Sequence, residues 1–355
     1  MIDILNDILP YISGLYTLPW ILVGFIITII LSKKIKREKI DRIMKKIGLI
    51  LLYFFIPLLV FRIFLNTDFG QKQIEFAIVV LIIIFFMYFL AFIYARYIAD
   101  KYKFTKTKKR LFFKTVLTNQ GRSSAFIGGA LLASPWKVEA AIYIALVGIA
   151  LFAIIPAILS YMHKKETKKI EKSENIKSLP WFLKLYPWYL ITFVISAVAI
   201  HATTGITTKN LGPDLETLLI FYTAVTIPAA LYYVGAGIHP KDLKITELKK
   251  LIGIDRNKKP GDHWSWVRNI FVLTVILTPI LTAFIFFPLY LANLISNSWF
   301  AVIIINSILP ITSTNMFLIP YGIDKRSTAH SVTWTTIVCV PIVVLLITLF
   351  GLYLN

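Results

Sequence analysis

Long apolar segments dominate this chain and restrict it to folds that are built inside a lipid bilayer. About 20 apolar residues in a helix are enough to cross the hydrocarbon core. The mean hydropathy of +0.75 and the 57% of hydrophobic residues exceed what a soluble domain can bury. We predict an all-α membrane protein with ten transmembrane helices. Their segments are residues 10–31, 47–66, 74–98, 111–133, 138–162, 181–202, 214–238, 267–291, 298–320 and 329–353.

The positive charge of the chain follows membrane topology and does not indicate a nucleic-acid partner. The formal net charge is +20, yet the basic residues gather in alternate flanks of the apolar segments. By the positive-inside rule these flanks are cytoplasmic, which places both termini outside the cell membrane. The basic flanks are residues 33–46, 96–114, 164–184, 241–268 and 325–326. The expected partner of the chain is the lipid bilayer.

The two halves of the chain repeat each other weakly. Residues 1–162 and residues 181–355 hold five segments each, and the charged residues 163–180 form a cytoplasmic linker between them. Because five is odd, the second half enters the membrane in the opposite orientation. Pro57 in the first half has a counterpart in Pro228 in the second. Inverted repeats of this kind are typical of secondary transporters, whose substrate site lies near the membrane midplane.

Polar residues interrupt the fourth segment halfway, in the stretch TNQGRSSAFIGG at 118–129. Polar or bent backbone at membrane depth needs a cavity or protein around it, so a lipid-facing helix would not carry this stretch. Glycine lets the backbone leave helical geometry, the amides offer donors and acceptors, and the hydroxyls begin a second half-helix that favours an anion. The helix break is Gly121, and the candidate substrate-binding residues are Asn119, Gln120, Arg122, Ser123 and Ser124.

The ninth segment contains a similar interruption, LPITSTNMFLIPYG at 309–322. Proline removes a backbone donor and kinks the helix, and four polar residues follow it at once. Such side chains can bond back to the preceding turn, but four in a row cannot all do so while facing lipid. We therefore predict that the fourth and ninth helices are broken and cross at the site. The helix break is Pro310, and the candidate substrate-binding residues are Thr312, Ser313, Thr314 and Asn315.

Arg122 lies near the middle of the fourth segment, where a charge is costly. Insertion scales give an arginine at the centre of a membrane helix a cost of about 2.5 to 3.5 kcal/mol. No Asp or Glu lies at matching depth. A substrate carboxylate could accept the guanidinium donors through two parallel N–H bonds, or backbone carbonyls freed at the breaks could do so. The sequence leaves both open. Arg62 lies near the outer end of its segment and is expected to be structural.

Motifs in the second, fourth, ninth and tenth segments carry a family resemblance. They are YFFIPLLVF at 53–61, Asn119 and Gly121, then Leu309, Pro310, Asn315, Tyr321, Gly322 and Asp324, and finally residues 331–341. On these residues the chain resembles the auxin efflux carrier family of PIN-like transporters, over essentially its whole length. The resemblance implies two inverted five-helix repeats, with the broken helices crossing at the site of a small organic anion. The chain departs from the family pattern at Arg122, Ser124 and Phe126, which leaves the substrate open.

Enzyme, sensor and channel functions are the alternatives to a carrier. An enzyme needs a nucleophile with a base or a metal cluster, and the chain has one cysteine and no HExxH, GxSxG or P-loop motif. We therefore expect no catalysis, no metal and no cofactor. A membrane sensor would use the same cavity without transport, and a channel would show a charged ring or a repeated filter sequence.

We predict a secondary transporter that exports a small organic anion by alternating access. An inside-negative potential favours export of a monovalent anion by about 2.3 kcal/mol per 100 mV, so export needs no coupling ion. The acidic residues and the histidines lie at or beyond segment ends, and no proton relay is visible. Sodium coupling, the direction of transport and assembly as a homodimer stay open.

The topology can be tested by labelling single cysteines in a Cys339→Ala background. Cysteines that replace Lys168 and Lys72 should react from opposite sides of the membrane, because the first lies in a basic flank and the second does not. Labelling of intact cells or oriented vesicles with an impermeant maleimide measures this. Reaction of both positions from the same side would contradict the predicted topology.

Overall fold

All of the regular structure that the computed structural model describes is helical. The described residues are 19–68, 70–122, 136–167, 181–236, 245–254, 262–312, 315, 318–319 and 321–354. Within them the only β-structure is one isolated bridge. The all-α prediction is therefore confirmed. Five helices are long and apolar enough to cross a membrane, in agreement with a multi-pass membrane protein. They are Arg42–Leu65, Gln71–Lys101, Pro213–Tyr233, His263–Leu291 and Lys325–Tyr353.

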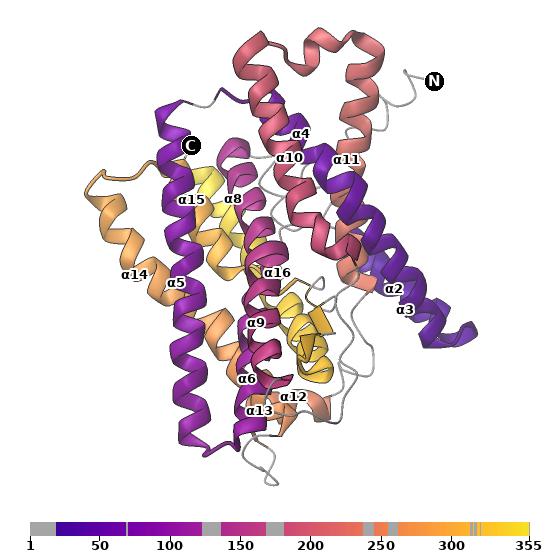
Figure 1. Cartoon of the computed structure of the whole chain (residues 1–355), viewed down its shortest axis with the longest axis vertical. Coiled ribbons are helices and arrows are strands. Elements are labelled where there is room, and N and C mark those ends of the chain that lie inside the picture. The colour runs from indigo at the N-terminus through magenta and orange to yellow at the C-terminus, as the bar shows by residue number, and fades with distance from the viewer. Residues whose placement is uncertain are drawn as a thin grey trace.

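Each of the ten apolar segments contains helical residues (Figure 1). In chain order the first five segments contain α2 (Trp20–Lys34); α3 (Arg37–Ile50), η3 (Leu51–Phe55) and α4 (Ile56–Leu65); α5 (Gln71–Lys101); α6 (Lys106–Thr118); and α8 (Lys137–Ile149), η4 (Ala150–Ile154) and α9 (Ile155–Thr167). The second five contain α10 (Trp181–Thr204); α11 (Pro213–Ala236); α13 (His263–Phe271), η7 (Val272–Leu277) and α14 (Thr278–Leu291); α15 (Asn297–Ile308); and α16 (Lys325–Tyr353). Two short helices, η5 (Thr208–Leu211) and α12 (Ile245–Ile252), lie between segments.

Three of the helical segments widen into a π-helix just before a proline. The π-helices η3, η4 and η7 end two residues before Pro57, Pro156 and Pro279. Proline has no N–H and clashes with the carbonyl four residues earlier, and a wider turn relieves that clash. Pro228, which the sequence pairs with Pro57, lies instead inside the regular helix α11. The two prolines therefore differ in their local geometry.

The helices form two groups, which separate in Figure 1. One group consists of α2, α3, α4, α10 and α11, and the other contains α5, α6, α8, α9 and α13 to α16. The main contacts between the groups run from α4 and α10 to α8 and η4. Each group therefore combines helices from both halves of the chain.

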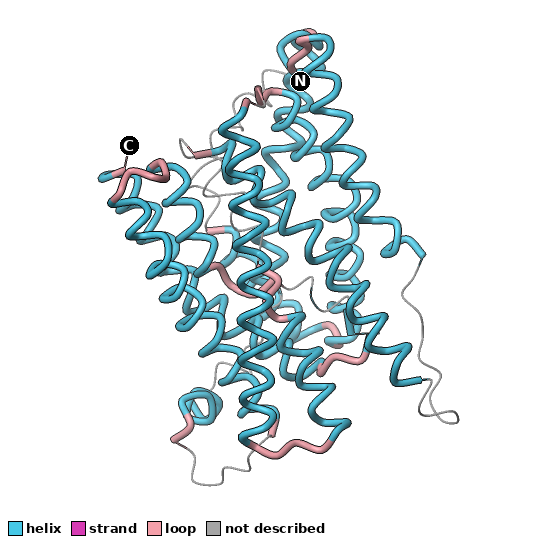
Figure 2. Tube along the Cα trace, turned by 60° about the vertical axis from the view of Figure 1, so that its left-hand side comes forward, coloured by secondary structure: helices cyan, strands magenta, loops and turns pink. Residues whose placement is uncertain are grey.

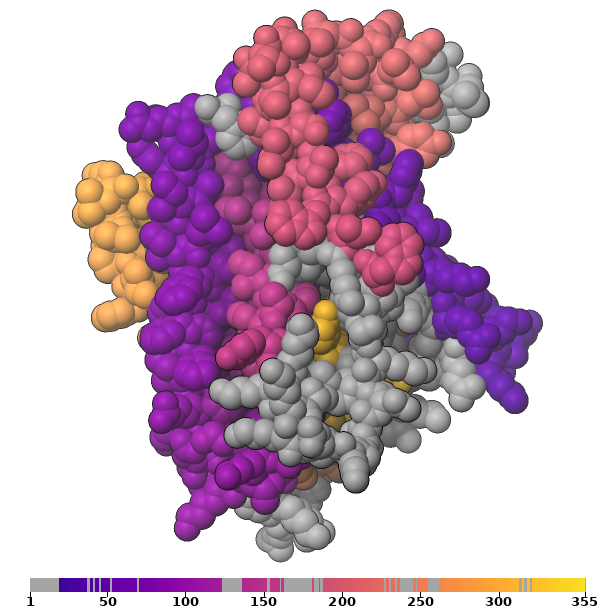
Figure 3. All heavy atoms as spheres, in the orientation of Figure 1, coloured from indigo at the N-terminus to yellow at the C-terminus, as the bar shows by residue number. Residues whose placement is uncertain are grey.

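Apolar side chains cover the outside of the molecule as well as its interior. In α5, Val80 and Ile83 are buried, whereas Ile82, Phe85 and Phe89 are exposed. Figure 3 shows this helix, in purple, along one flank of the molecule. A helix that is apolar all round fits a position between a protein core and lipid. The exposed face of α5 is the kind of surface that a bilayer would cover.

Helices α2 and α11 cross with their backbones in direct contact. A Cβ atom added to Gly24 would lie 2.2 Å from the carbonyl oxygen of Tyr232. One added to Gly235 would lie 1.9 Å from the carbonyl oxygen of Ile21. Small residues at a crossing let membrane helices approach this closely. The two glycines therefore fix the spacing of the first group.

Gly235→Ala should lower the melting temperature of the purified protein. The added methyl group cannot fit without separating α2 from α11, and overpacking typically costs about 1 to 3 kcal/mol. Gly351→Ala is the matched control, because no atom lies within 4 Å of an added Cβ there and alanine favours a helix. Thermal melts in detergent measure both. Equal melting temperatures for Gly235→Ala and the unmodified protein would contradict the packing argument.

Candidate functional site

Two non-helical backbone segments meet inside the second group of helices. Figure 2 shows such loop segments at mid-height of the molecule, between helices that reach both ends. Helix α6 ends at Thr118 and α15 ends at Ile308, and the two helices come from opposite ends (Figure 1). The N–H of Thr312 donates to the carbonyl of Gly121 at 3.0 Å, and Arg122 forms an antiparallel bridge with Ile311. The two predicted breaks are therefore in contact.

The residues at the break after α6 explain why that helix stops. The N–H groups of Gln120 and Gly121 bond to carbonyls only three residues back, which tightens the last turn. The Nδ2 of Asn119 donates to the carbonyl of Thr115 at 2.7 Å. A Cβ on Gly121 would lie 2.7 Å from Oδ1 of Asn315 and 2.7 Å from a methyl group of Leu151, so a larger residue would have to displace both side chains.

Helix α15 ends because a proline follows it. Leu309 has an extended conformation (φ −54°, ψ 145°), which is the region that a residue before proline prefers. Its carbonyl consequently points away from the helical ladder. The next N–H, that of Ile311, donates to the hydroxyl of Thr335 on α16 at 3.1 Å. A side chain from another helix thus replaces the backbone partner that the break removes.

Buried polar atoms without a protein partner gather where the breaks meet. Asn119 and Asn315 are fully buried, and Gln120 and Arg122 are each 2% exposed. Among the described residues, the atoms without a hydrogen bond there include Oδ1 of Asn119, both amide atoms of Gln120 and of Asn315, and Nε of Arg122. Each unpaired buried group costs about 1 to 3 kcal/mol, and native proteins pair such groups with protein, water or ligand. Their concentration marks this junction as the candidate binding site.

Arg122 donates to two backbone carbonyls. One guanidinium nitrogen lies 3.3 Å from the oxygen of Leu309, and the other lies 3.2 Å from the oxygen of Thr274 in η7. No Asp or Glu is among the buried polar residues that the structure describes. The positive charge is therefore held by neutral oxygens and is not balanced by a buried carboxylate.

A small cavity lies beside Arg122. Its volume is about 10 Å³, which is roughly the room that one water molecule needs. It is lined by Ile84, Met87, Tyr88, Gln120, Arg122, Tyr143, Val147 and Ala150. A polar wall of an amide, a guanidinium and two tyrosines faces apolar side chains. Any ligand larger than water requires this cavity to widen.

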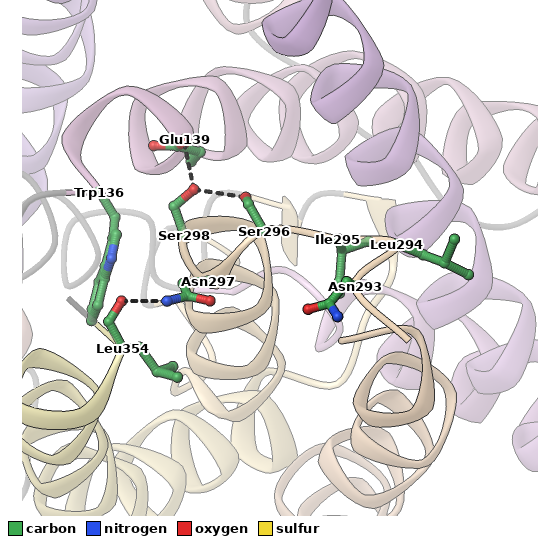
Figure 4. A pocket seen from close by; sticks show the side chains of 9 residues that line it. All are labelled: Trp136, Glu139, Asn293, Leu294, Ile295, Ser296, Asn297, Ser298 and Leu354. Carbon is green, nitrogen blue, oxygen red and sulfur yellow. Dashed lines mark hydrogen bonds between the residues drawn. The ribbon is translucent and has the colours of Figure 1, made fainter. Parts of the chain in front are cut away.

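A larger cavity, of about 870 Å³, lies at the other end of α15 (Figure 4). Four of its polar side chains, those of Glu139, Ser296, Asn297 and Ser298, form hydrogen bonds within the protein. The hydroxyl of Ser298 donates to Glu139 at 2.8 Å, and Nδ2 of Asn297 donates to the carbonyl of Leu354 at 3.0 Å. We therefore place the candidate site at the junction of the breaks, where polar atoms remain unpaired.

All of the predicted site residues that the structure describes lie in the two segments that meet. Asn119, Gln120, Gly121, Arg122, Pro310, Thr312 and Asn315 all belong to the two segments that meet. Ser123, Ser124, Ser313 and Thr314 lie outside the described residues. The sequence reasoning missed Thr274, Thr328 and Thr335, which supply oxygens to Arg122, Asn119 and Ile311. The run of hydroxyl side chains in SVTWTT at 331–336 was a signal for Thr335.

Comparison with known proteins gives no relative from which a function could be transferred. No protein-family model matches the chain, and no curated protein is significantly similar to it.

Thr335→Val should destabilise the protein by about 1 to 3 kcal/mol. The substitution keeps the shape of the side chain but leaves the buried N–H of Ile311 without an acceptor. Thr348→Val on the same helix is the control, because that hydroxyl is exposed and bonds only to the carbonyl of Val344 in its own helix. The free energy of unfolding in detergent measures the difference. If both variants were equally stable, the hydrogen bond between Thr335 and Ile311 would not contribute to the free energy of unfolding.

Proposed function

We propose that this protein is a membrane carrier for a small organic anion, which binds where α6 and α15 end. The observation that carries the proposal is the fully enclosed guanidinium of Arg122 among side-chain amides with unpaired atoms. A guanidinium has five N–H donors, and the two carbonyls use only part of them. The remaining donors suit the two oxygens of a carboxylate.

The arrangement of the helices supports a carrier of the inverted-repeat type. Each half of the chain contributes one helix that ends inside the bundle, and the two come from opposite ends. We propose ten membrane-spanning helices in two inverted repeats, with the fourth and ninth helices broken and crossing and with both termini outside the cell. On this basis, and on the motifs of the sequence, the chain is proposed to resemble the auxin efflux carriers in function as well.

The closed cavity supports alternating access rather than a permanent pore. A volume of about 10 Å³ admits no organic anion, so binding requires a rearrangement that opens the site. The polar groups of the site that the structure describes are amides, hydroxyls and one guanidinium, which bind an anion, and no buried carboxylate among the described residues could serve as a base. Carriage is therefore proposed and catalysis is not.

Arg122→Lys should reduce affinity for a transported monocarboxylate about tenfold, because the charge stays but one charge-assisted hydrogen bond is lost. Arg122→Ala should abolish transport while the protein remains monodisperse. Uptake and efflux of a panel of radiolabelled mono- and dicarboxylates by the purified protein in liposomes measures both.

Arg62→Lys is the matched control for this experiment. Arg62 also bonds to a carbonyl and a hydroxyl, those of Ile220 and Thr223, but it joins α4 to α11 in the other group of helices. Transport should survive in this variant. Undiminished transport by Arg122→Ala would refute the anion site, and binding without any transport by the unmodified protein would indicate a sensor.

A further inference from the structure

The two carbonyls that hold Arg122 lack helical N–H partners, one because of a proline and the other because its helix ends. In η7 the N–H of Thr278 bonds to the carbonyl of Leu273, five residues back. The same pattern would pair the carbonyl of Thr274 with residue 279, which is a proline and has no N–H. The other carbonyl, that of Leu309, leaves the helical ladder immediately before Pro310. Both oxygens are thus available to a cation.

Two helix ends contribute negative potential at these oxygens. Helices α6 and α15 both have their C-terminal ends at the junction, and each C-terminus has a partial charge of roughly −0.5. Two such ends offset about one positive charge. Backbone carbonyls and helix C-termini at unwound segments are also the ligands by which carriers and channels bind alkali cations. The site would therefore attract a monovalent cation if Arg122 were absent.

We propose that Arg122 is a built-in cation, whose guanidinium fills a monovalent-cation site made of carbonyl oxygens. The chain then supplies for itself the positive charge that a coupling ion would otherwise bring to the substrate anion. The cation site follows from the geometry alone. Its consequence, transport that needs no sodium or proton gradient, rests on the proposed carrier function.

Removing the side chain should turn the filled site into an empty one that binds free cations. Arg122→Ala should melt at a lower temperature than the unmodified protein in choline chloride, because choline is too large for the site. Guanidinium chloride at about 10 mM should raise its melting temperature by about 3 °C, and sodium or potassium chloride should also raise it. The unmodified protein should melt at the same temperature in all four salts at this concentration.

Two variants separate a specific cation site from a general salt effect. Arg122→Met fills most of the space without a charge, and Arg122→Lys keeps a tethered charge, so neither should respond to the cation. A response to guanidinium, sodium and potassium that only Arg122→Ala shows would support the proposal. Precipitation of this variant in every salt, or equal melting in choline and in guanidinium, would overturn it.

These measurements need no substrate, so they remain decisive even if the liposome assay finds no transported anion. Where transport is found, a second readout is available. Transport by the unmodified protein should be unchanged when choline replaces sodium. A sodium requirement of the unmodified protein, or its stabilisation by sodium, would show that Arg122 does not take the place of the ion.

Discussion

The backbone pairing between the two breaks is the interaction on which the centre of the structure depends. Inside a bilayer, N–H and C=O groups that leave a helix find no water, and each unsatisfied group costs several kcal/mol. The N–H of Thr312 meets the carbonyl of Gly121, and the hydroxyl of Thr335 accepts from Ile311. The two helix ends therefore depend on each other and on α16 for the hydrogen bonds of their exposed backbone groups.

Arg122 links a third element, η7, to the two breaks. Its guanidinium joins the α6 break to the α15 break and to η7, and each of its hydrogen bonds involves a charged donor. Hydrogen bonds to charged groups contribute about 1.5 to 3 kcal/mol each, which is comparable to the roughly 2.5 to 3.5 kcal/mol that an arginine at the centre of a membrane helix costs. A proline frees one acceptor and a helix end frees the other, and the arginine binds both.

Local chemistry made much of this site predictable from the sequence, and long-range contacts account for what was missed. The depth of Arg122, its lack of an acidic neighbour and the breaks at Gly121 and Pro310 follow from residue types within single segments. Thr274 and Thr328 gave no signal in the sequence, and Thr335 only that of the hydroxyl run at 331–336, because a hydroxyl in a membrane helix usually bonds to its own preceding turn. The contact of Gly24 with α11 was equally hidden, since no pattern in one sequence connects residues so far apart.

The distribution of these bonds also bears on how the closed cavity can open. Arg122 and the residues that bond to it all belong to the second group of helices, as does the Thr312 to Gly121 pair. Separating the two breaks from each other would leave buried backbone groups unpaired, at about 1 to 3 kcal/mol for each. The closed cavity is lined by residues of α5, α8, η4 and the α6 break. A shift of the second group against α4 and α10 would leave this lining as it is, whereas movement of α5 and α8 against the breaks would widen the cavity and keep every one of these hydrogen bonds. The energetics therefore favour the second movement, with the arginine and its carbonyls carried as one rigid unit.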